Sequence, residues 1–350
     1  YLYLYILIFD GDTATLSPMS TPEVTQINPL DHLANLAWAA GDRLRLGVLR
    51  VLARDAFGVL ELCQLFDIKQ PSMSHHLKIL SEAGLVVHRR EGTNLYYRRA
   101  PAPSALIAEL FCALDATPMD ALTSQRLEAV QATRAEASRR FFAQFGQEYR
   151  EHQDLIARLA DYGPRVVERA TALAADGVIL EIGPGGGELL PELASQARTV
   201  IALDASAEML AQAQQYAAQH NANNIRFVHG DTASVQTSGL PLADVIVMNM
   251  VLHHTARPAD IFLDVARLLA PGGSFLLTEL CDHSQGEKAR EVCGDVWPGF
   301  HPDTLTSWAM AAGLVPAREE YQAQRNGFRL QLREFTQPVS ATTVNPIALT

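Results

Sequence analysis

The stretch VILEIGPGGGELLPELA, residues 178–194, decides the fold of the larger part of this chain. An apolar strand ends at Glu181, and a helix follows the loop. The loop has glycine at alternate positions: Gly183, Gly185 and Gly187. Glycines let the backbone turn tightly and let a ligand approach closely. The spacing departs from the GxGxxG dinucleotide fingerprint at Glu188, and no lysine completes a phosphate-binding P-loop.

Strand-like and helix-like stretches alternate from residue 164 onward. The predicted strands are 177–183, 199–204, 225–231, 243–251 and 273–280. The predicted helices are 187–197, 206–220 and 258–270. Such alternation is typical of an α/β domain in which a parallel sheet has helices on both faces.

Two acids follow the next two strands. Asp204 ends the strand TVIALD and Asp231 ends the stretch IRFVHGD. Together with E-x-G-x-G-x-G, ADVIVMNMVLHH (243–254) and LLAPGGSFLLTE (268–279), they resemble the ordered motifs of class I S-adenosylmethionine (SAM) methyltransferases. The resemblance covers residues of about 140–335. A purely structural glycine turn would not explain the two strand-end acids.

The resemblance implies SAM, or its product S-adenosylhomocysteine, as the cofactor. Asp204 would accept the ribose hydroxyls, and Asp231 would meet the adenine amino group. The implied cofactor-binding residues are Glu181, Gly183, Gly185, Gly187, Asp204, Ala205, Asp231, Thr232 and Asn249. Phe141, Phe142, Phe145 and Tyr149 either cover the cofactor or belong to the core.

His253 and His254 are the catalytic candidates, because histidine accepts a proton near neutral pH. The alternative is that this pair only shapes the loop. In-line methyl transfer mainly requires alignment and exclusion of water, so the sequence need not contain a base.

The N-terminal third has a different pattern. Helices are predicted within 31–54, with a break near Gly41–Asp42, and at 58–67, 70–83 and 103–116. A hairpin is predicted at 85–100, and residues 117–140 are predicted to be a helical connector. In the helix at 70–83, Met73, Leu77 and Leu80 share one face, which should pack inward, while the other face is polar.

Helix–turn–helix followed by an arginine-rich hairpin resembles the winged-helix repressors of the ArsR family over residues of about 30–116. The pieces that carry the resemblance are GDRLRLGVLRVL, ELCQLF, QPSMSHHLKILSEAGLV and HRREGTNLYYRR. The resemblance implies a homodimer, formed through the first and last helices, on a double-stranded DNA operator. The alternative is a fold kept for dimerisation alone. The implied DNA-binding residues are Gln70, Ser72, Ser74, His75, Lys78, Arg89 and Arg90, and Arg98 and Arg99 also lie on the hairpin.

The charge distribution fits this division. The whole chain has a net charge of -11, yet residues 31–100 hold ten Lys+Arg against seven Asp+Glu. Residues 101–350 hold eighteen against twenty-nine. A basic block before a long acidic one is typical of a nucleic-acid module joined to another domain.

Four scattered cysteines make no disulfide framework and favour a reducing cytoplasm. ArsR-like metal sensors often have a Cys-x-Cys pair where this chain has Cys63-Gln64-Leu65, so the sequence predicts no metal site. Arsenite methylation requires several thiols, and only Cys281 and Cys293 lie in the methyltransferase-like part. No stretch is apolar for long enough to span a membrane.

We expect residues 1–30 to be an extension without regular structure, non-native up to residue 18 because Met19 resembles a natural start. We expect residues 336–350 to be a loose tail.

Two functions remain open: a regulator whose second domain senses SAM or S-adenosylhomocysteine, and a small-molecule methyltransferase whose winged helix only autoregulates its operon.

Overall fold

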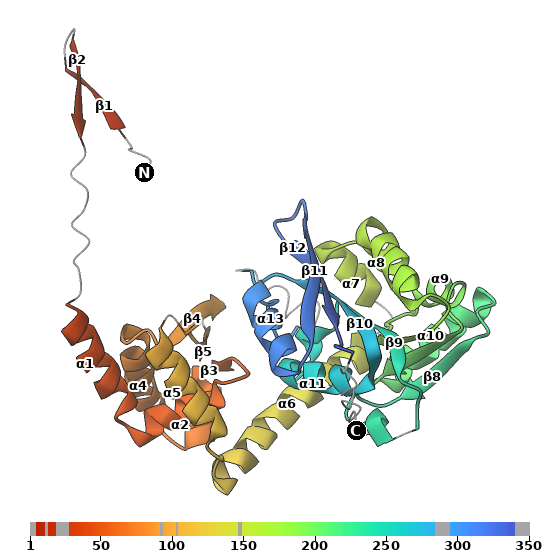
Figure 1. Ribbon diagram of the computed structural model, residues 1–350, viewed down its shortest axis with the longest axis horizontal. Helices are drawn as coiled ribbons and strands as arrows, with labels where there is room; N and C mark the ends of the chain where they lie inside the picture. The colour runs from red at the N-terminus through yellow and green to blue at the C-terminus, as the bar shows by residue number, and fades with distance from the viewer. Residues whose placement is uncertain are drawn as a thin grey trace, which may run out of the picture.

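The computed structural model describes residues 5–10, 13–18, 28–91, 94–102, 104–145, 149–237, 239–283 and 295–339. Two folded domains follow one another along the chain, as expected (Figure 1). No helix within these ranges is long and apolar enough to cross a membrane.

The first domain is a winged helix. Its elements are α1 (Pro29–Ala40), α2 (Arg43–Val51), β3 (Phe57–Gly58), α3 (Val59–Phe66), α4 (Gln70–Glu82), β4 (Val86–Glu91), β5 (Asn94–Arg99) and α5 (Ala105–Ala116). Asp42 caps α2 by accepting a hydrogen bond from the Arg45 N–H, which explains the break after α1. Met73, Leu77 and Leu80 are fully buried, so the predicted inward face of α4 is confirmed. The three strands form a small antiparallel sheet in the order β3-β5-β4.

Before the winged helix, β1 (Tyr5–Asp10) and β2 (Thr13–Pro18) pair as an antiparallel hairpin. This differs from the expected lack of regular structure. The apolar and β-branched residues of this stretch favour strands, which explains the difference. The non-native status of residues 1–18 stays a prediction.

A single helix, α6 (Ala121–Phe145), connects the two domains (Figure 1). It covers most of the predicted connector and extends five residues beyond residue 140. Its first half packs against α3 of the winged helix.

The second domain is built on a seven-stranded sheet in the order β11-β12-β10-β9-β6-β7-β8. Its strands are β6 (Val178–Ile182), β7 (Thr199–Asp204), β8 (Ile225–His229), β9 (Ala243–Asn249), β10 (Leu269–Leu280), β11 (Val315–Ala323) and β12 (Arg329–Thr336). The first five are parallel, whereas β12 runs antiparallel to β10 and β11. The sheet is therefore mixed, because the last two strands, which the sequence pattern does not reveal, form a hairpin.

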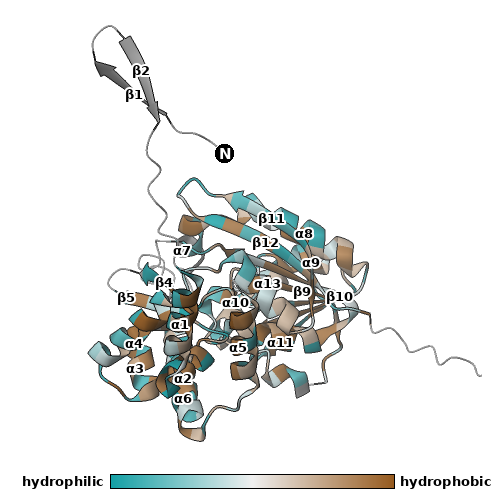
Figure 2. Cartoon of the chain, turned by 60° about the vertical axis from the view of Figure 1, so that its left-hand side comes forward, coloured by the Kyte–Doolittle hydropathy of each residue, from teal (hydrophilic) through white to brown (hydrophobic). Residues whose placement is uncertain are grey.

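Helices cover both faces of this sheet. They are α7 (Tyr149–Ile156), α8 (Leu159–Ala174), α9 (Leu190–Ala194), α10 (Ala207–Gln219), α11 (Pro258–Leu268) and α13 (Pro302–Ala311), with short 3-10 turns η1 (Ser234–Thr237) and η2 (Leu252–His254). Alternate residues of β6 enter different cores: Ile179 packs on the side of α8 and α9, and Leu180 packs on the side of α11 and α13. Figure 2 shows the central strands β9 and β10 as mainly hydrophobic, and the edge strand β11 and its neighbour β12 as more hydrophilic.

The β12 strand ends at Thr336, and residues 337–339 have no regular structure. Residues 340–350 of the expected loose tail lie outside the described residues.

Candidate functional site

The glycine loop joins β6 to α9 at the carboxyl end of the parallel strands. Gly183, Gly185 and Gly187 all have positive φ, at +68°, +59° and +86°. A Cβ at Gly185 would meet nothing within 4 Å, so this residue faces open space. A Cβ at Gly187 would lie 2.8 Å from the Cα atom of Ala213 in α10. The loop therefore contains one glycine that lets the helix pack closely and others that face a cavity.

Two adjoining cavities open beside this loop, with volumes of about 720 Å³ and about 260 Å³. Gly183, Gly185, Met209 and Val251 line both. The larger cavity also reaches these predicted residues: Asp204, Ala205, Asp231 and Thr232. The smaller one reaches Glu181 and Asn249. Eight of the nine predicted cofactor residues thus come together, and the exception is Gly187.

The smaller cavity contains unsatisfied hydrogen-bond acceptors. Glu181 is 2% exposed, and neither its Oε2 atom nor the Oδ1 atom of Asn249 has a hydrogen-bond partner among the described residues. Burial, together with the negative charges of Glu188 and Asp204, raises the pKa of Glu181 to about 8. Buried acceptors without partners are costly, so this end of the site suits a ligand that donates hydrogen bonds or carries positive charge.

The larger cavity has a carboxylate at the end of β7. Burial raises the pKa of Asp204 to about 6, although its Oδ1 atom accepts a hydrogen bond from the Ser206 N–H at 2.8 Å. Asp231 lies after β8 and accepts a hydrogen bond from the Ser234 N–H. Thr232 is buried, and its hydroxyl donates to Asp264 at 2.7 Å. Thr232 therefore shapes the wall, and both strand-end acids line the same cavity.

The opposite wall of the larger cavity is α6. Its lining residues are Gln131, Ala132, Ala135, Ser138, Arg139 and Phe142. Of the aromatic residues expected to cover the cofactor, Phe142 lines the cavity and Phe141 packs on Phe142. The side chains of Phe145 and Tyr149 lie outside the described residues. The polar α6 residues are missing from the sequence prediction, because their spacing does not differ from that of a solvent-exposed helix.

The two catalytic candidates lie side by side in η2 but differ in position. His254 lines the larger cavity and contacts the ring of Phe142, with ring centroids 5.0 Å apart. His253 lies behind it, with its Nδ1 atom 2.6 Å from Oε1 of Glu279. Burial lowers the pKa of His253, but the charges of Glu279 and Asp295 more than offset this and raise it to about 9.

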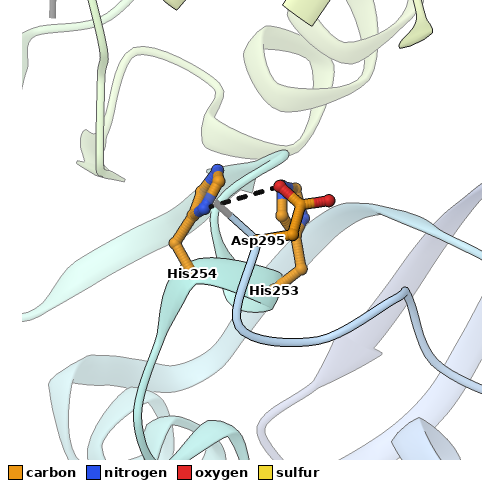
Figure 3. Close-up of side chains that lie close together, drawn as sticks. All are labelled: His253, His254 and Asp295. Carbon is orange, nitrogen blue, oxygen red and sulfur yellow. Dashed lines mark ion pairs between the residues drawn. The ribbon is translucent and has the colours of Figure 1, made fainter. Parts of the chain in front are cut away.

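Asp295 completes a buried cluster with the two histidines (Figure 3). Its Oδ1 atom lies 3.6 Å from His253 Nε2 and 3.8 Å from His254 Nδ1. Sequence reasoning does not find this cluster, because no spacing pattern connects Asp295 to residues about forty positions earlier.

The winged helix presents a separate polar surface. The predicted residues Gln70, Ser72, Ser74, His75 and Lys78 are exposed along α4. Lys78 is paired with Glu82 at 3.7 Å, which still leaves both side chains in solvent. Among the described residues the polar face of the N-terminal half of α4 is thus exposed, as a helix that enters a DNA groove requires.

The four hairpin arginines differ in environment. Arg90 is exposed, and Arg89 is half-buried beside the Tyr96 ring. Arg98 reaches Thr304 of the second domain at 3.5 Å. The Arg99 side chain is 9% exposed and donates hydrogen bonds to both oxygens of Asp115 and to the Leu49 carbonyl. These partners hold Arg99 against the helices of its own domain.

The thiols give no arsenite-binding cluster among the described residues. Cys281 is buried, with its Sγ atom 3.3 Å from Arg329 Nε. Cys63 is half-buried in α3. Cys293 lies outside the described residues.

Comparisons with known proteins match both halves. Residues 180–277 match a family model described as a methyltransferase domain, and residues 40–89 match one described as a helix-turn-helix domain. N-methyltransferase NodS from Bradyrhizobium japonicum, solved with S-adenosylhomocysteine, is 20% identical with a TM-score of 0.43, over 54% of this chain and 98% of that one.

Curated relatives match one half each. An uncharacterized HTH-type transcriptional regulator of Methanocaldococcus jannaschii is 46% identical over 19% of this chain and 78% of its own length. The arsenical resistance operon repressor of Escherichia coli is 36% identical over 20% of this chain and 60% of its own. The ubiquinone biosynthesis O-methyltransferase of Caulobacter sp. is 32% identical over 29% of this chain. The chain spans only 40% of that enzyme.

The winged helix, the cavity beside the glycine loop and these matches agree with one another. The chain belongs to the HTH-type transcriptional regulators, is similar to ArsR/SmtB-type repressors in its winged helix, and carries a methyltransferase domain after it.

Proposed function

We propose that this chain is a DNA-binding regulator whose methyltransferase domain binds SAM or S-adenosylhomocysteine and passes its state of occupancy to the winged helix. The observation that carries the proposal is the position of α6. One face of this helix lines the larger cavity, and the same helix is bonded to the winged helix.

The site fits the cofactor. The unpartnered acceptors of Glu181 and Asn249 suit the ammonium group at the amino-acid end of SAM. Asp204 suits the ribose hydroxyls, and Asp231 suits the adenine amino group. Gly185 leaves room for the ligand to pass close to the backbone. When bound, SAM supplies a methyl group on a positively charged sulfur; the residues of this chain hold and align it.

Polar contacts of α6 lead from the cavity to the winged helix. Gln131 lines the cavity, and its Nε2 atom donates to Asp55 of the winged helix at 3.4 Å. One turn further along α6, Arg134 forms two hydrogen bonds of 2.7 Å to Glu61 on α3 and one of 3.0 Å to the Ala56 carbonyl. A ligand that moves α6 would therefore move α3, which packs directly on the DNA-facing α4.

Arg134 also contacts an aromatic ring of each domain. Its guanidinium lies 4.6 Å from the Phe57 ring and 4.8 Å from the Trp297 ring, so it is held between the two domains. Arg54 and Asp260, which lines the cavity, form a further pair at 3.5 Å. Differential affinity of the ligand for two arrangements of this junction is the requirement for regulation.

The DNA-binding form is a homodimer on a double-stranded operator in the cytoplasm. Exposed apolar side chains support it: Leu30, Leu33 and Trp38 on α1, and Leu106 on α5. These are the first and last helices of the winged-helix domain, through which the family pairs. A two-fold protein would place two copies of α4 in successive major grooves.

Methyl transfer to a small molecule is compatible with sensing. The larger cavity extends past the cofactor residues to His254, so space for an acceptor adjoins a polar group. The acceptor's chemical class stays open, and a function of His253 or His254 as a base stays a prediction. A winged helix that only autoregulates its operon is less favoured, because α6 contacts the cavity and the winged helix together.

Titration calorimetry of the full chain with SAM and with S-adenosylhomocysteine tests the cofactor part. We expect one equivalent of either ligand per chain. Asp204→Asn removes a charged acceptor and should weaken binding about tenfold to a hundredfold, as expected for a charged hydrogen bond. Glu192→Asn, an exposed change on α9, is the matched control. Absence of binding, or equal binding by Asp204→Asn, would contradict the assignment.

A further inference from the structure

The buried cluster of His253, His254 and Asp295 has the donors and spacing of a metal site. We propose that it binds one divalent transition-metal cation of the Zn²⁺ kind at the edge of the larger cavity. Ion binding does not depend on the proposed regulatory function. Its use in methyl transfer, considered below, rests on the proposed binding of SAM in the adjoining cavity.

The distances favour an ion between the three side chains. The donor atoms all lie within 4.8 Å of one another. The separations of 3.6 Å and 3.8 Å from Asp295 Oδ1 to the two imidazole nitrogens exceed hydrogen-bond length. Two ligands at metal–ligand distances of about 2.1 Å and near-tetrahedral angles lie about 3.3–3.6 Å apart. A small contraction would therefore complete the coordination.

Glu279 orients one of the ligands. The Nδ1–H of His253 donates to Oε1 of Glu279 at 2.6 Å, which directs the Nε2 lone pair toward Asp295. The carboxylate itself is fixed, since its oxygens accept from the N–H groups of His253 and Leu280 at 3.1 Å and 2.7 Å. A carboxylate behind a ligating histidine is the usual outer partner of such metal sites.

The backbone holds the third ligand in place. The carbonyl of His253 accepts hydrogen bonds from the N–H groups of Val296 and Trp297, the two residues after Asp295, at 2.9 Å and 3.0 Å. The Trp297 indole N–H donates to the Thr255 carbonyl at 2.7 Å. These bonds tie the segment that carries Asp295 to the turn that carries the histidines, so the donors meet without rearrangement of the fold.

The donor set selects the metal class. Two imidazoles and one carboxylate suit Zn²⁺ or a neighbouring transition metal, whereas Mg²⁺ and Ca²⁺ prefer oxygen ligands. Burial favours occupancy as well: Glu279 and Asp295 are 0% and 2% exposed, and a nearby cation stabilises buried carboxylates.

The position of His254 determines what the ion could do. His254 lines the cavity, so a coordination position beside it would face the space next to the cofactor residues. Three protein ligands and one open position are typical of catalytic zinc. If methyl transfer occurs there, an ion in this position would acidify an acceptor hydroxyl, and the histidines would act as ligands and not as bases.

The test uses the full chain after chelator treatment and dialysis, titrated with Zn²⁺ by calorimetry and with Co²⁺ by visible absorption. We expect one equivalent of each ion and the visible bands of a four- or five-coordinate Co²⁺ centre. Asp295→Asn and His254→Gln should abolish the bands. Glu279→Gln should weaken binding about tenfold to a hundredfold, as for an outer partner of a metal ligand.

The matched control is His301→Asn. His301 and Asp303 form an exposed pair at a similar separation, 3.6 Å, outside this cluster, so this variant should bind as the parent does. Circular dichroism checks the folding of each variant. If Asp295→Asn does not fold, the result for His254→Gln tests the proposal. No stoichiometric binding by the parent chain, or unchanged binding by the folded cluster variants, would overturn the proposal. SAM titration of the chelated chain separates this failure from failure of the proposed function.

Discussion

The three alternate glycines after β6 share a sequence pattern but have different neighbours. Gly185 faces the cavities, with open space where a Cβ would lie. Gly187 touches the backbone of α10. An added methyl group therefore affects ligand binding at one position and helix packing at the other.

We predict that Gly185→Ala costs only the strain of a left-handed alanine, about 1–2 kcal/mol. Its methyl group enters the ligand space, so SAM affinity should fall sharply. Gly187→Ala adds a clash that costs about 1–3 kcal/mol more, the usual cost of overpacking. Urea denaturation compares the two free energies of unfolding, and calorimetry compares the affinities. Equal stability losses would contradict the distinction.

Glu181 makes the ligand-free protein sensitive to pH. Its folded pKa of about 8 lies above the ordinary value of 4.5, so the folded state binds more protons than the unfolded state between these values. Stability from this group is therefore present at low pH and is lost as pH rises from 4.5 toward 8.

Glu181→Gln cannot ionise, so we predict a melting temperature above that of the parent at pH 8, by at least about 3 °C for a destabilisation of 1 kcal/mol or more. The difference should vanish near pH 4.5. Thermal denaturation across this range checks it, with the exposed Glu192→Gln as control. Parallel curves for Glu181→Gln and parent would show that the buried carboxylate is not destabilised.

For single residues, the sequence predicts which side chains reach the cavity when those residues directly follow a strand. Asp204 and Asp231 reach the cavity because the carboxyl ends of parallel strands meet at one edge. Gln131 and Asp295 are not predictable in this way, since their places depend on how α6 and the segment after β10 pack against the sheet. Periodicity carries no information on such contacts between distant parts of the chain.

At the scale of elements, the hairpin β4–β5 separates two kinds of arginine. Arg90 lies in solvent, and Arg99 is bonded to Asp115 and to the α2 backbone. The sequence pattern RR repeats on both strands, so it does not distinguish them. Pairing of β5 with both β3 and β4 places Arg99 against the helices.

We predict that Arg90→Ala weakens DNA binding, lowers the salt dependence of affinity by about one ion, and leaves stability within about 0.5 kcal/mol. Arg99→Ala removes the hydrogen bonds to Asp115 and to the Leu49 carbonyl and should cost about 1–3 kcal/mol, because the half-exposed Asp115 stays solvated without its partner. Anisotropy with operator DNA at several salt concentrations and urea denaturation measure the two effects. If the Arg99→Ala chain is as stable as the parent but binds DNA more weakly, Arg99 contacts DNA and does not stabilise the domain.

The α6 helix was predictable as a helix but not as a wall of the cavity. Its Ala- and Arg-rich composition favours a helix, whereas its packing is set by Arg134 between Glu61, Phe57 and Trp297. Likewise, the β11–β12 hairpin was missed because an antiparallel edge pair follows no strand–helix alternation.

We predict that Arg134→Ala lowers the free energy of unfolding by about 2–4 kcal/mol, because it leaves Glu61 without its partner. It should also reduce any effect of SAM on DNA affinity. Arg140→Ala is the control, since the Arg140 side chain is 78% exposed and its ion pair within the described residues is with Glu136. Denaturation measures the stability, and anisotropy measures the effect of SAM on DNA affinity. If Arg134→Ala matches Arg140→Ala in both, the Arg134 contacts do not couple the two domains.

At the scale of the whole molecule, the acidic methyltransferase domain and the mildly basic winged helix are joined by α6 and also touch through the contacts of Arg98 with Thr304 and of Arg54 with Asp260. The net negative charge limits non-specific attraction to DNA, so a modest change at α4 would alter operator occupancy. The cavity and the DNA-facing helix communicate only if α6 takes two arrangements of different ligand affinity.

The most direct test of this claim is fluorescence anisotropy of the chain's own promoter DNA at fixed salt, without ligand, with SAM, and with S-adenosylhomocysteine. We predict a shift in DNA affinity of about fivefold or more between ligand states, within the usual range of allosteric coupling. The shift should be lost in Arg134→Ala. Tight DNA binding that is the same in all three conditions, while calorimetry shows SAM bound, would contradict it and would leave two domains that work independently.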